Sequence, residues 1–182
     1  MIRILGHVAL AAVCAVCGLG ASRAAAAEPA VVPAVDLDRY QGTWHEWARF
    51  PHFFQRDCAG GVTATYSPAP DGSIAVLNRC RRADGSFIEA RGRARVADPA
   101  TRAKLEVSFL PAWLDWLPVG RGDYWIIALA PDYSAAVVGD RAREYLWILS
   151  RSADIDETRY LALVQRAAEQ GYPIERLQRT PR

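Results

Sequence analysis

Side chains that could carry acid–base or metal chemistry are few and scattered in this sequence. Three His occur, His7, His45 and His52, and no His-x-x-x-His or Cys-x-x-Cys pair follows residue 27. Zinc sites are built from such closely spaced ligands. The sequence also lacks the glycine-rich loops that bind phosphates and dinucleotides, and the Gly-x-Ser-x-Gly turn of hydrolases. It therefore predicts no metal site and no cofactor.

Glu46 has two competing interpretations. Residues 44–49 read Trp-His-Glu-Trp-Ala-Arg, in which Trp44 and Glu46 share one face of a strand. A shielded carboxylate there is either a general acid or a structural group held by a nearby cation or backbone N–H. No cluster of His or second carboxylate accompanies it, which favours the structural role. We expect no enzyme.

Cys58 and Cys80 are the two cysteines that follow residue 27. In an exported protein such a pair forms one disulfide. The predicted strands 62–67 and 74–80 form a hairpin through Pro70-Asp71-Gly72, which brings the two cysteines near one another. The alternative is two free buried thiols.

The first residues indicate export. Arg3 is followed by an apolar run over 4–19 and by an alanine-rich stretch that ends at Ala27. A basic start, an apolar core and an Ala-x-Ala site predict a signal peptide over 1–27, with one domain over 28–182 and localisation to the periplasm. The apolar run is shorter than the roughly 20 residues that span a bilayer. Lipid anchoring at Cys14 or Cys17 is less favoured, because the residues before them lack the usual Leu and small residue.

The charge balance excludes one class of partner. The chain has 22 Lys and Arg against 20 Asp and Glu. Two of the basic residues, Arg3 and Arg23, leave with the signal peptide, so the remainder is neutral. Nucleic-acid binding needs a basic face, and we expect none.

Short alternating segments separated by turn residues make up most of the chain after residue 40. Their spacing of roughly 8–12 residues is typical of an all-β sandwich or barrel. We expect eight strands, at about 42–49, 62–67, 74–80, 87–96, 104–109, 124–130, 135–138 and 145–151. A helix follows, capped by Asp154 or Asp156 and ended by Gly171. Its apolar stripe has to lie on the outside of the sheet: Tyr160, Leu161, Val164, Ala167 and Ala168.

Three separated motifs carry a family resemblance. Gly42-Thr43-Trp44 lies on the first strand, Pro131-Asp132-Tyr133 forms a turn, and Arg151 ends the last strand. In order and spacing the chain resembles the lipocalins, above all the bacterial outer-membrane lipocalins and apolipoprotein D. The resemblance implies an eight-stranded antiparallel up-and-down β-barrel, open at one end, with the helix packed on the outer wall. It also implies that Arg151 lies over Trp44 at the closed end, near Glu46.

Strand alternation within that barrel predicts a lumen lined by apolar side chains with a few polar groups, which describes a pocket for a hydrophobic ligand. Ala90, Gly92 and Ala94 form a wall of small residues that leaves space for it. The alternative is that large neighbours fill the gap. The expected lining is Ala48, Ala64, Tyr66, Ile74, Val76, Asn78, Ala90, Gly92, Ala94, Val107, Phe109, Tyr124, Ile126, Ala128, Val137 and Trp147.

The resemblance also implies that the loops after the first and fifth strands lie at the open end, where they would place aromatic residues at the barrel mouth. The loop after the first strand carries Phe50, Phe53 and Phe54, and the loop after the fifth carries Trp113 and Trp116. A soluble protein rarely exposes so much aromatic surface without a use, and Trp favours the membrane interface. Arg56 and Arg121 flank these loops and are expected to meet a phosphate or carboxylate head group.

Together these features predict a protein that binds, stores or carries a fatty acid or lysophospholipid in the periplasm, with contact to the outer-membrane surface. Two alternatives stay open. The aromatic mouth could dock a protein partner, or the barrel could carry an enzyme.

Overall fold

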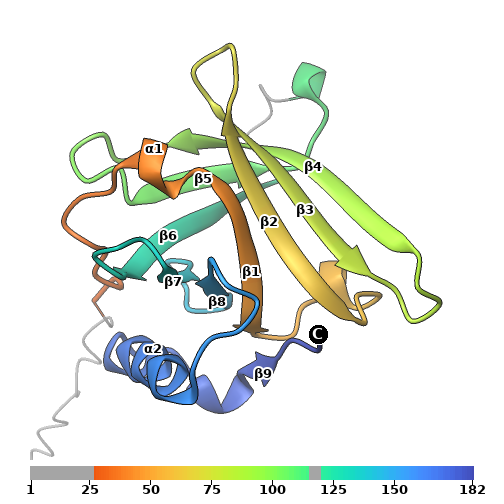
Figure 1. The fold of residues 1–182 in the computed structure, drawn as a ribbon. Coiled ribbons are helices and arrows are strands. Elements are labelled where there is room, and N and C mark those ends of the chain that lie inside the picture. Colours follow the sequence, from red (N-terminus) through yellow and green to blue (C-terminus); the bar gives the residue numbers. More distant parts are fainter. Residues whose placement is uncertain (1–26, 115–119) are drawn as a thin grey trace, which may run out of the picture.

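The computed structural model describes residues 27–114 and 120–182; the predicted signal peptide, with Cys14 and Cys17, lies outside the described residues. Antiparallel strands follow one another around a closed barrel, because β1 pairs with both β2 and β8 (Figure 1). The strands are β1 (Gly42–Arg49), β2 (Gly60–Pro68), β3 (Ile74–Arg81), β4 (Phe87–Val96), β5 (Lys104–Ser108), β6 (Arg121–Leu129), β7 (Ala135–Gly139) and β8 (Leu146–Ser150). The predicted eight-stranded barrel is confirmed.

A short helix, α1 (Leu37–Tyr40), covers one end of the barrel. Its Asp36 cap accepts hydrogen bonds from two backbone N–H groups of the first turn, which would otherwise be unsatisfied. Leu37 and Tyr40 bury their side chains in the barrel interior. This end of the barrel is therefore closed.

Arg151 and Trp44 lie together at the closed end, as predicted. The Arg151 guanidinium lies 4.0 Å from the centroid of the Trp44 ring. It also donates hydrogen bonds to the backbone oxygens of Thr43 and Arg39, at 3.0 and 2.9 Å. The expectation that Glu46 also lies beside Arg151 is wrong, because Glu46 pairs with Arg49 nearer the other end of β1.

The second helix, α2 (Glu157–Glu169), packs on the outer wall as predicted, with Asp156 as its cap. Its buried residues Tyr160, Leu163 and Ala167 join an apolar cluster with outward-facing residues of β6, β7 and β8. Leu161, which the sequence placed in the buried stripe, is exposed, and Leu163 takes that position. Within the described residues no helix is long and apolar enough to cross a bilayer.

Three single-turn 3-10 helices complete the described chain: η1 (Phe53–Gln55), η2 (Ala112–Leu114) and η3 (Ile174–Arg176). After η3 a two-residue strand, β9 (Gln178–Arg179), pairs with β1. Thr180 then donates its backbone N–H to Trp47, and Pro181 accepts from Gly61. The sequence did not predict this C-terminal segment, which runs antiparallel to β1 from Arg49 back to Trp47 and then contacts the start of β2.

Two irregularities change which side chains face the interior. The pairing of β1 with β8 shifts between Glu46 and Ala48, and that of β6 with β7 shifts between Ile126 and Ala128. An extra residue in one strand inverts the alternation beyond it. The faces of these two strands therefore cannot be followed from end to end by simple alternation.

Candidate functional site

Side chains fill the barrel interior near its closed end. Trp44, Tyr66 and Ile126 belong to one buried apolar cluster there. A cavity there has a volume of about 20 Å³, which is room for about one water molecule. Its lining is Leu37, Tyr40, Gln41, Tyr66, Ile74, Ala94, Leu105, Val107 and Tyr124. A larger ligand therefore has to lie nearer the open end.

Three tyrosine hydroxyl groups form a hydrogen-bonded chain beside this small cavity. The hydroxyl of Tyr124 lies 2.9 Å from that of Tyr40 and 2.8 Å from that of Tyr66. Burial raises the pKa of Tyr66 to about 12 and raises the pKa values of Tyr40 and Tyr124 well above their usual value. The three groups are therefore neutral donors and acceptors at the base of an apolar lumen.

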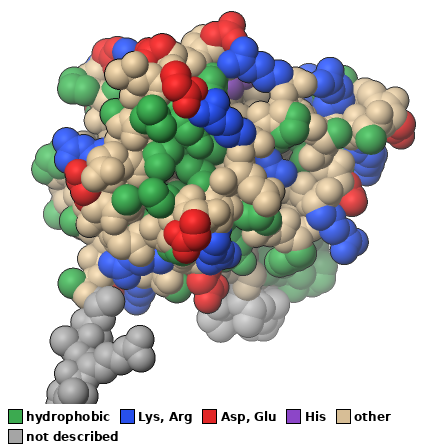
Figure 2. Space-filling model, turned by 90° about the horizontal axis from the view of Figure 1, so that it is seen from below, with side chains coloured by type: hydrophobic (Ala, Val, Ile, Leu, Met, Phe, Trp, Pro, Cys, Tyr) green, Lys and Arg blue, Asp and Glu red, His purple; other side chains and the backbone are tan. Residues whose placement is uncertain are grey.

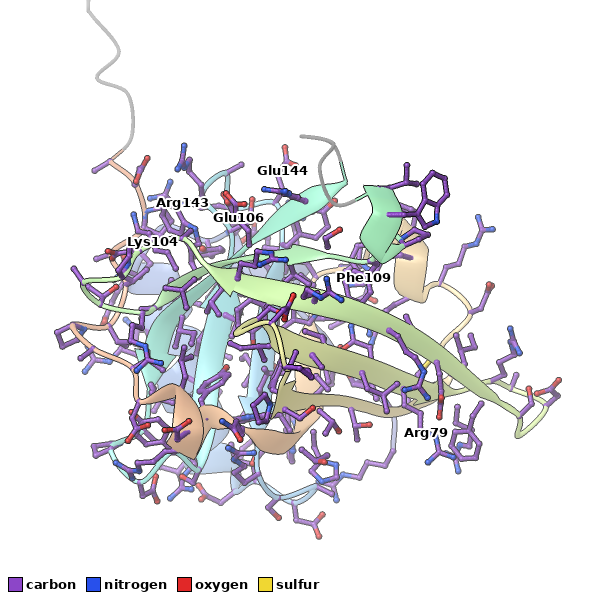
Figure 3. The ribbon with its side chains drawn as sticks, turned by 90° about the horizontal axis from the view of Figure 1, so that it is seen from above. Arg79, Lys104, Glu106, Phe109, Arg143 and Glu144 are labelled. Carbon is purple, nitrogen blue, oxygen red and sulfur yellow. A yellow bond between two sulfur atoms is a disulfide. The ribbon has the colours of Figure 1, made fainter. Side chains whose placement is uncertain are left out.

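The predicted wall of small residues is partly covered. A Cβ atom built on Gly92 would lie 2.8 Å from the Phe109 ring and 2.7 Å from the backbone oxygen of Ser108. Figure 3 shows Phe109 at the β4 ribbon, close to η2. The alternative, in which a large neighbour fills the gap, is therefore correct at Gly92. Farther toward the open end Ala90 is exposed.

Most of the predicted lumen residues do face inward. The strand register puts Asn78 opposite Ala64 and Ala90, and Gly92 opposite Val76, on the inner face. The other inward-facing members of the set pack in or against the interior cluster: Ala64, Tyr66, Ile74, Val76, Ala94, Val107, Tyr124, Ile126 and Trp147.

Three residues predicted to line the lumen lie instead on the outer side, in the cluster beneath α2: Ala48, Ala128 and Val137. Ala48 and Ala128 follow the two register shifts, which turn them outward. Val137 pairs with the outward-facing Ile148. Every residue of its strand β7 is buried, so the strand shows no polar alternation from which its faces could be told apart.

The mouth exposes aromatic side chains from two loops. Phe53 and Phe54 of η1 are 75% and 52% exposed, and Trp113 of η2 is 74% exposed. The lower face of the molecule in Figure 1, seen directly in Figure 2, also gathers hydrophobic side chains in its middle, with charged side chains around them. The protein therefore offers apolar surface that its own fold does not cover.

The other residues predicted at the mouth do not share one location in the structure. Phe50 lies outside the barrel, fully buried against Tyr172 and beneath the Arg176 guanidinium, so its assignment to the mouth is wrong. Trp116 lies outside the described residues. Arg56 is exposed beside Asp57, at 3.8 Å, and Arg121 lies 3.4 Å from Glu106.

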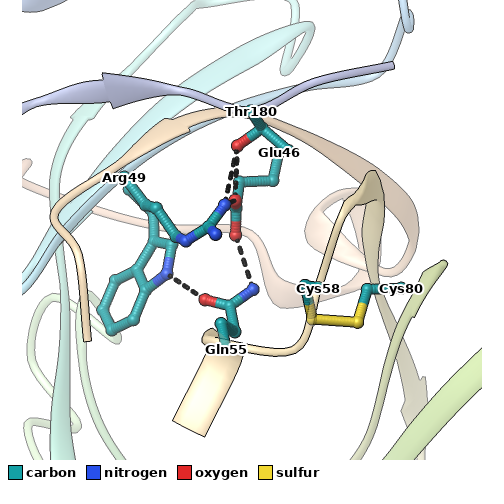
Figure 4. The surroundings of a disulfide bond; sticks show 7 residues. Glu46, Arg49, Gln55, Cys58, Cys80 and Thr180 are labelled. Carbon is teal, nitrogen blue, oxygen red and sulfur yellow. Dashed lines mark hydrogen bonds and ion pairs between the residues drawn. A yellow bond between two sulfur atoms is a disulfide. The ribbon is translucent and has the colours of Figure 1, made fainter. Parts of the chain in front are cut away.

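A polar cluster lies inside the open end, around Glu46 (Figure 4). Its Oε1 accepts hydrogen bonds from Arg49 Nη1 at 2.6 Å and from Thr180 Oγ1 at 2.5 Å. Its Oε2 accepts from Gln55 Nε2 at 2.9 Å, and Gln55 Oε1 accepts from Trp147 Nε1 at 3.5 Å. The Glu46 and Arg49 side chains are only 4% and 15% exposed, so this is a shielded ion pair.

Sequence reasoning missed Arg49, Gln55 and Thr180. By alternation Arg49 should face away from Glu46, and it faces the same way because of the register shift between them. On a regular strand residues three apart face opposite sides, so the spacing of Glu46 and Arg49 gave no signal of this pairing. No local pattern pointed to Thr180.

His52 adjoins this cluster and packs among aromatic rings. Its imidazole stacks on Phe54 at 3.7 Å and contacts Trp147 and Tyr145 at 5.6 and 6.0 Å. Both ring nitrogens are buried and make no hydrogen bond of normal geometry, although the Gln55 side chain lies close enough to interact with the ring. Burial, helped by the charge of Arg49, lowers the pKa of His52 to about 4. The imidazole is therefore neutral at pH 7.

Cys58 and Cys80 form the predicted disulfide, with their Cα atoms 5.6 Å apart. The bond fastens the segment after η1 to the end of β3 (Figure 4), which limits how far the mouth loop can move.

Across residues 27–114 and 120–182, no three His, Cys, Asp or Glu side chains gather where they could hold a metal ion.

The barrel, its closing arginine and its apolar interior agree with a known family. A family model described as the lipocalin-like domain matches residues 35–182. The chain belongs to the lipocalin family. Lipocalins generally bind small hydrophobic ligands and are generally not enzymes.

Relatives of this lipocalin come from plants, bacteria and animals. Temperature-induced lipocalin-1 of Arabidopsis thaliana is 45% identical over 157 residues, covering 85% of this chain and 83% of that protein. Outer membrane lipoprotein Blc of Escherichia coli (strain K12) is 37% identical over 147 residues, covering 80% and 78%. Apolipoprotein D of Mus musculus is 28% identical over 159 residues, covering 84% and 79%. The predicted resemblance is confirmed.

Solved lipocalin structures share the fold at low sequence identity. Insecticyanin from the tobacco hornworm Manduca sexta superimposes with a TM-score of 0.64 at 17% identity, over 86% of both chains.

The turn Pro131-Asp132-Tyr133, one of the three family motifs, has a structural role in this lipocalin. Tyr133 accepts a hydrogen bond at its hydroxyl from the Asp36 backbone, and Asp132 accepts two from Ser134.

Proposed function

We propose that this lipocalin binds a fatty acid or lysophospholipid, with its acyl chain in the open half of the barrel. The inner face there carries this proposal. Ala64 is only partly buried although it faces inward, and Ala90 is exposed. Burying each acyl CH₂ group against such walls contributes about 0.8 kcal/mol. An acyl chain is the ligand that uses this surface best.

We also propose that the protein stores or carries its ligand in the periplasm. The predicted signal peptide supports export, and a disulfide persists in an oxidising compartment. The relative Blc is named an outer membrane lipoprotein, and we extend that association to this chain as contact with the membrane surface. The exposed Phe53, Phe54 and Trp113 suit such contact, because aromatic side chains favour the interface between acyl chains and water.

The experiment is native mass spectrometry of the purified protein, followed by extraction and identification of any lipid. We expect a bound single-chain lipid, and quenching or enhancement of Trp147 fluorescence when lipid is added back to the stripped protein. Stripped protein that binds neither fatty acids nor lysophospholipids would contradict the proposal. Retention of a protein partner in place of lipid would favour the docking alternative.

A further inference from the structure

Arg49 uses only part of its hydrogen-bonding capacity. Nη1 donates to Glu46 at 2.6 Å and to Thr180 at 3.2 Å. Nε and Nη2 have no partner anywhere in residues 27–114 or 120–182. They are not among the buried atoms that lack a partner, so solvent still reaches them. One edge of this guanidinium is therefore satisfied, and the other is open to a ligand.

The open edge has the geometry of a carboxylate receptor. The Nε–H and Nη2–H groups of arginine point in parallel and match the two oxygens of a carboxylate. The Arg49 side chain is only 15% exposed, and charge-assisted hydrogen bonds are stronger where water is scarce. Glu46 already offsets the arginine charge, so a ligand with one negative charge suits this site better than one with two.

His52 is a second polar group with unused hydrogen-bonding capacity beside Arg49. Its two ring nitrogens are buried and make no hydrogen bond of normal geometry, and the Arg49 charge acts on it. The other titratable groups nearby are Glu46, which pairs with Arg49 on β1, and Tyr145, which directly precedes β8 and contacts the imidazole. A ligand oxygen could reach the imidazole if the Phe54 ring, which is stacked on it and 52% exposed, moved outward.

We propose that Arg49 and His52 hold the carboxylate head group of a fatty acid, with Nε and Nη2 of Arg49 as the main donors. The inference rests on the proposed lipid-binding function and narrows it to free fatty acids. It also moves the head group from Arg56 and Arg121, which sequence reasoning favoured, to a position inside the barrel. The acyl chain then extends from the cluster along the inner face.

The test compares two ligands that share a chain and differ in head group. Dissociation constants for dodecanoate and 1-dodecanol are measured by calorimetry at pH 7.4 for the parent, for Arg49→Lys and for a control, Arg79→Lys. Arg79 lies on the outer side of β3, 3.8 Å from Glu89 (Figure 3). Lysine keeps the positive charge beside Glu46 but cannot present two parallel N–H groups to a carboxylate.

We expect the parent to bind dodecanoate at least about 10-fold more tightly than dodecanol, since hydrogen bonds to a charged group are strong. Arg49→Lys should lose about 10- to 100-fold in dodecanoate affinity and less than about 3-fold in dodecanol affinity. The control should bind both ligands as the parent does. The double variant Glu46→Gln/Arg49→Gln, which leaves no unpaired buried charge, should show the same selective loss if Arg49→Lys folds poorly.

Two failures are distinguishable. A parent that binds both ligands equally, with no selective loss in either variant, keeps lipid binding and overturns the head-group assignment. A parent that binds neither ligand overturns both proposals. Selective loss of dodecanoate binding in Arg79→Lys would also overturn the assignment, because the Arg79 side chain lies on the outer side of the barrel, away from the lumen.

The part played by His52 has its own readout. Dodecanesulfonate keeps a constant charge between pH 5 and 7. Any proton that is taken up on binding is therefore bound by a group of the protein and not by the ligand. A negative head group beside the imidazole favours its protonated form, so parent affinity should rise as the pH falls from 7 to 5. His52→Phe, which keeps the ring contacts, should show no such rise. The same pH dependence in both proteins would remove His52 from the site.

Discussion

The Phe109 ring occupies the space that a side chain on Gly92 would need. A Cβ atom there would lie 2.8 Å from two carbons of the ring, well inside van der Waals contact. The small residue on β4 therefore makes room for Phe109, which reaches over from the end of β5. Ligand capacity at this level of the barrel depends on where that ring lies.

Replacing Gly92 with Leu should destabilise the protein. The new side chain meets both the Phe109 ring and the Ser108 backbone oxygen, and overpacking of this kind costs about 1–3 kcal/mol. Urea denaturation measures the change. The matched control is Ala90→Leu on the same face of β4, where the residue is exposed and the change should stay within about 0.5 kcal/mol. Equal stability of Gly92→Leu and the parent would show that Phe109 moves away freely.

Replacing Phe109 with Ala should enlarge the space open to a ligand. The ring is 45% exposed, so its loss should cost less stability than loss of a buried phenylalanine. We expect the variant to gain affinity for branched or ring-bearing lipids relative to straight chains. Titration with both ligand types measures this, and an unchanged preference would place the ligand elsewhere.

Replacing Arg151 with Ala should lower stability and leave ligand affinity unchanged. The variant loses the contact with Trp44 and two hydrogen bonds to backbone oxygens, worth about 1–3 kcal/mol together. Thermal unfolding and lipid titration are measured together. Arg91→Ala, at an exposed pair with Glu89, should cost less than about 1 kcal/mol. Loss of binding without loss of stability would assign Arg151 to the binding site.

Reduction of the Cys58–Cys80 bond should destabilise the chain that begins at residue 28. The cysteines are separated by 22 positions, and opening a loop of this length costs about 3 kcal/mol in the chain-entropy model. Urea denaturation with and without dithiothreitol measures it. The double variant Cys58→Ala/Cys80→Ala should not respond to the reductant. Two thiols that titrate before reduction would contradict the bond.

Replacing Tyr124 with Phe should cost about 1–3 kcal/mol, because its hydroxyl is the central member of the tyrosine chain and leaving buried polar groups unpaired is expensive. Tyr145→Phe is the control, since the Tyr145 hydroxyl has no hydrogen-bond partner in the described part of the chain. Denaturation curves should separate the two variants. Equal stability would mean that water in the small cavity replaces the lost hydroxyl.

Stability should fall as the pH drops from about 6.5 to about 4, partly because of His52. Its pKa is about 4 in the folded protein against 6.5 for the free side chain. In that window the unfolded chain binds a proton that the folded chain does not, so acid favours unfolding. Partial exposure reduces the effect to on the order of 1–2 kcal/mol. The melting temperature should drop between pH 7 and pH 4.5, and this drop should be smaller for His52→Phe than for the parent. An equal drop in both proteins would contradict the role of His52 in acid destabilisation.

Much of the fold could be predicted because its signals are local. Alternation and turn residues indicate the strands, Asp156 and Gly171 delimit the last helix, and the hairpin joins the cysteines. The inner faces of β1 and β6 could not be predicted beyond their register shifts, since one extra residue inverts the alternation. For that reason the sequence wrongly placed Ala48 and Ala128 in the lumen.

The polar part of the candidate site was harder to predict than its apolar part. Most inward-facing apolar residues follow from strand alternation alone. The environment of Glu46 depends on Arg49, which a register shift turns inward, and on groups brought by distant segments. Phe50 was misplaced for a similar reason, because the segment that covers it, around Tyr172, comes from far along the chain.

Thr180 completes the hydrogen bonds of Glu46 from 134 positions further along the chain. Contacts between residues so far apart form only after a large loss of chain entropy. The pairing of β1 with β8 that closes the barrel also joins residues far apart in the chain, such as His45 and Ser150, and β9 pairs with the same strand β1. The polar cluster at the mouth therefore needs both β1 and the C-terminal segment in place before it acquires its geometry. Under the proposed head-group assignment, a newly made chain cannot recognise a head group at this cluster until its last residues have been made and have paired with β1.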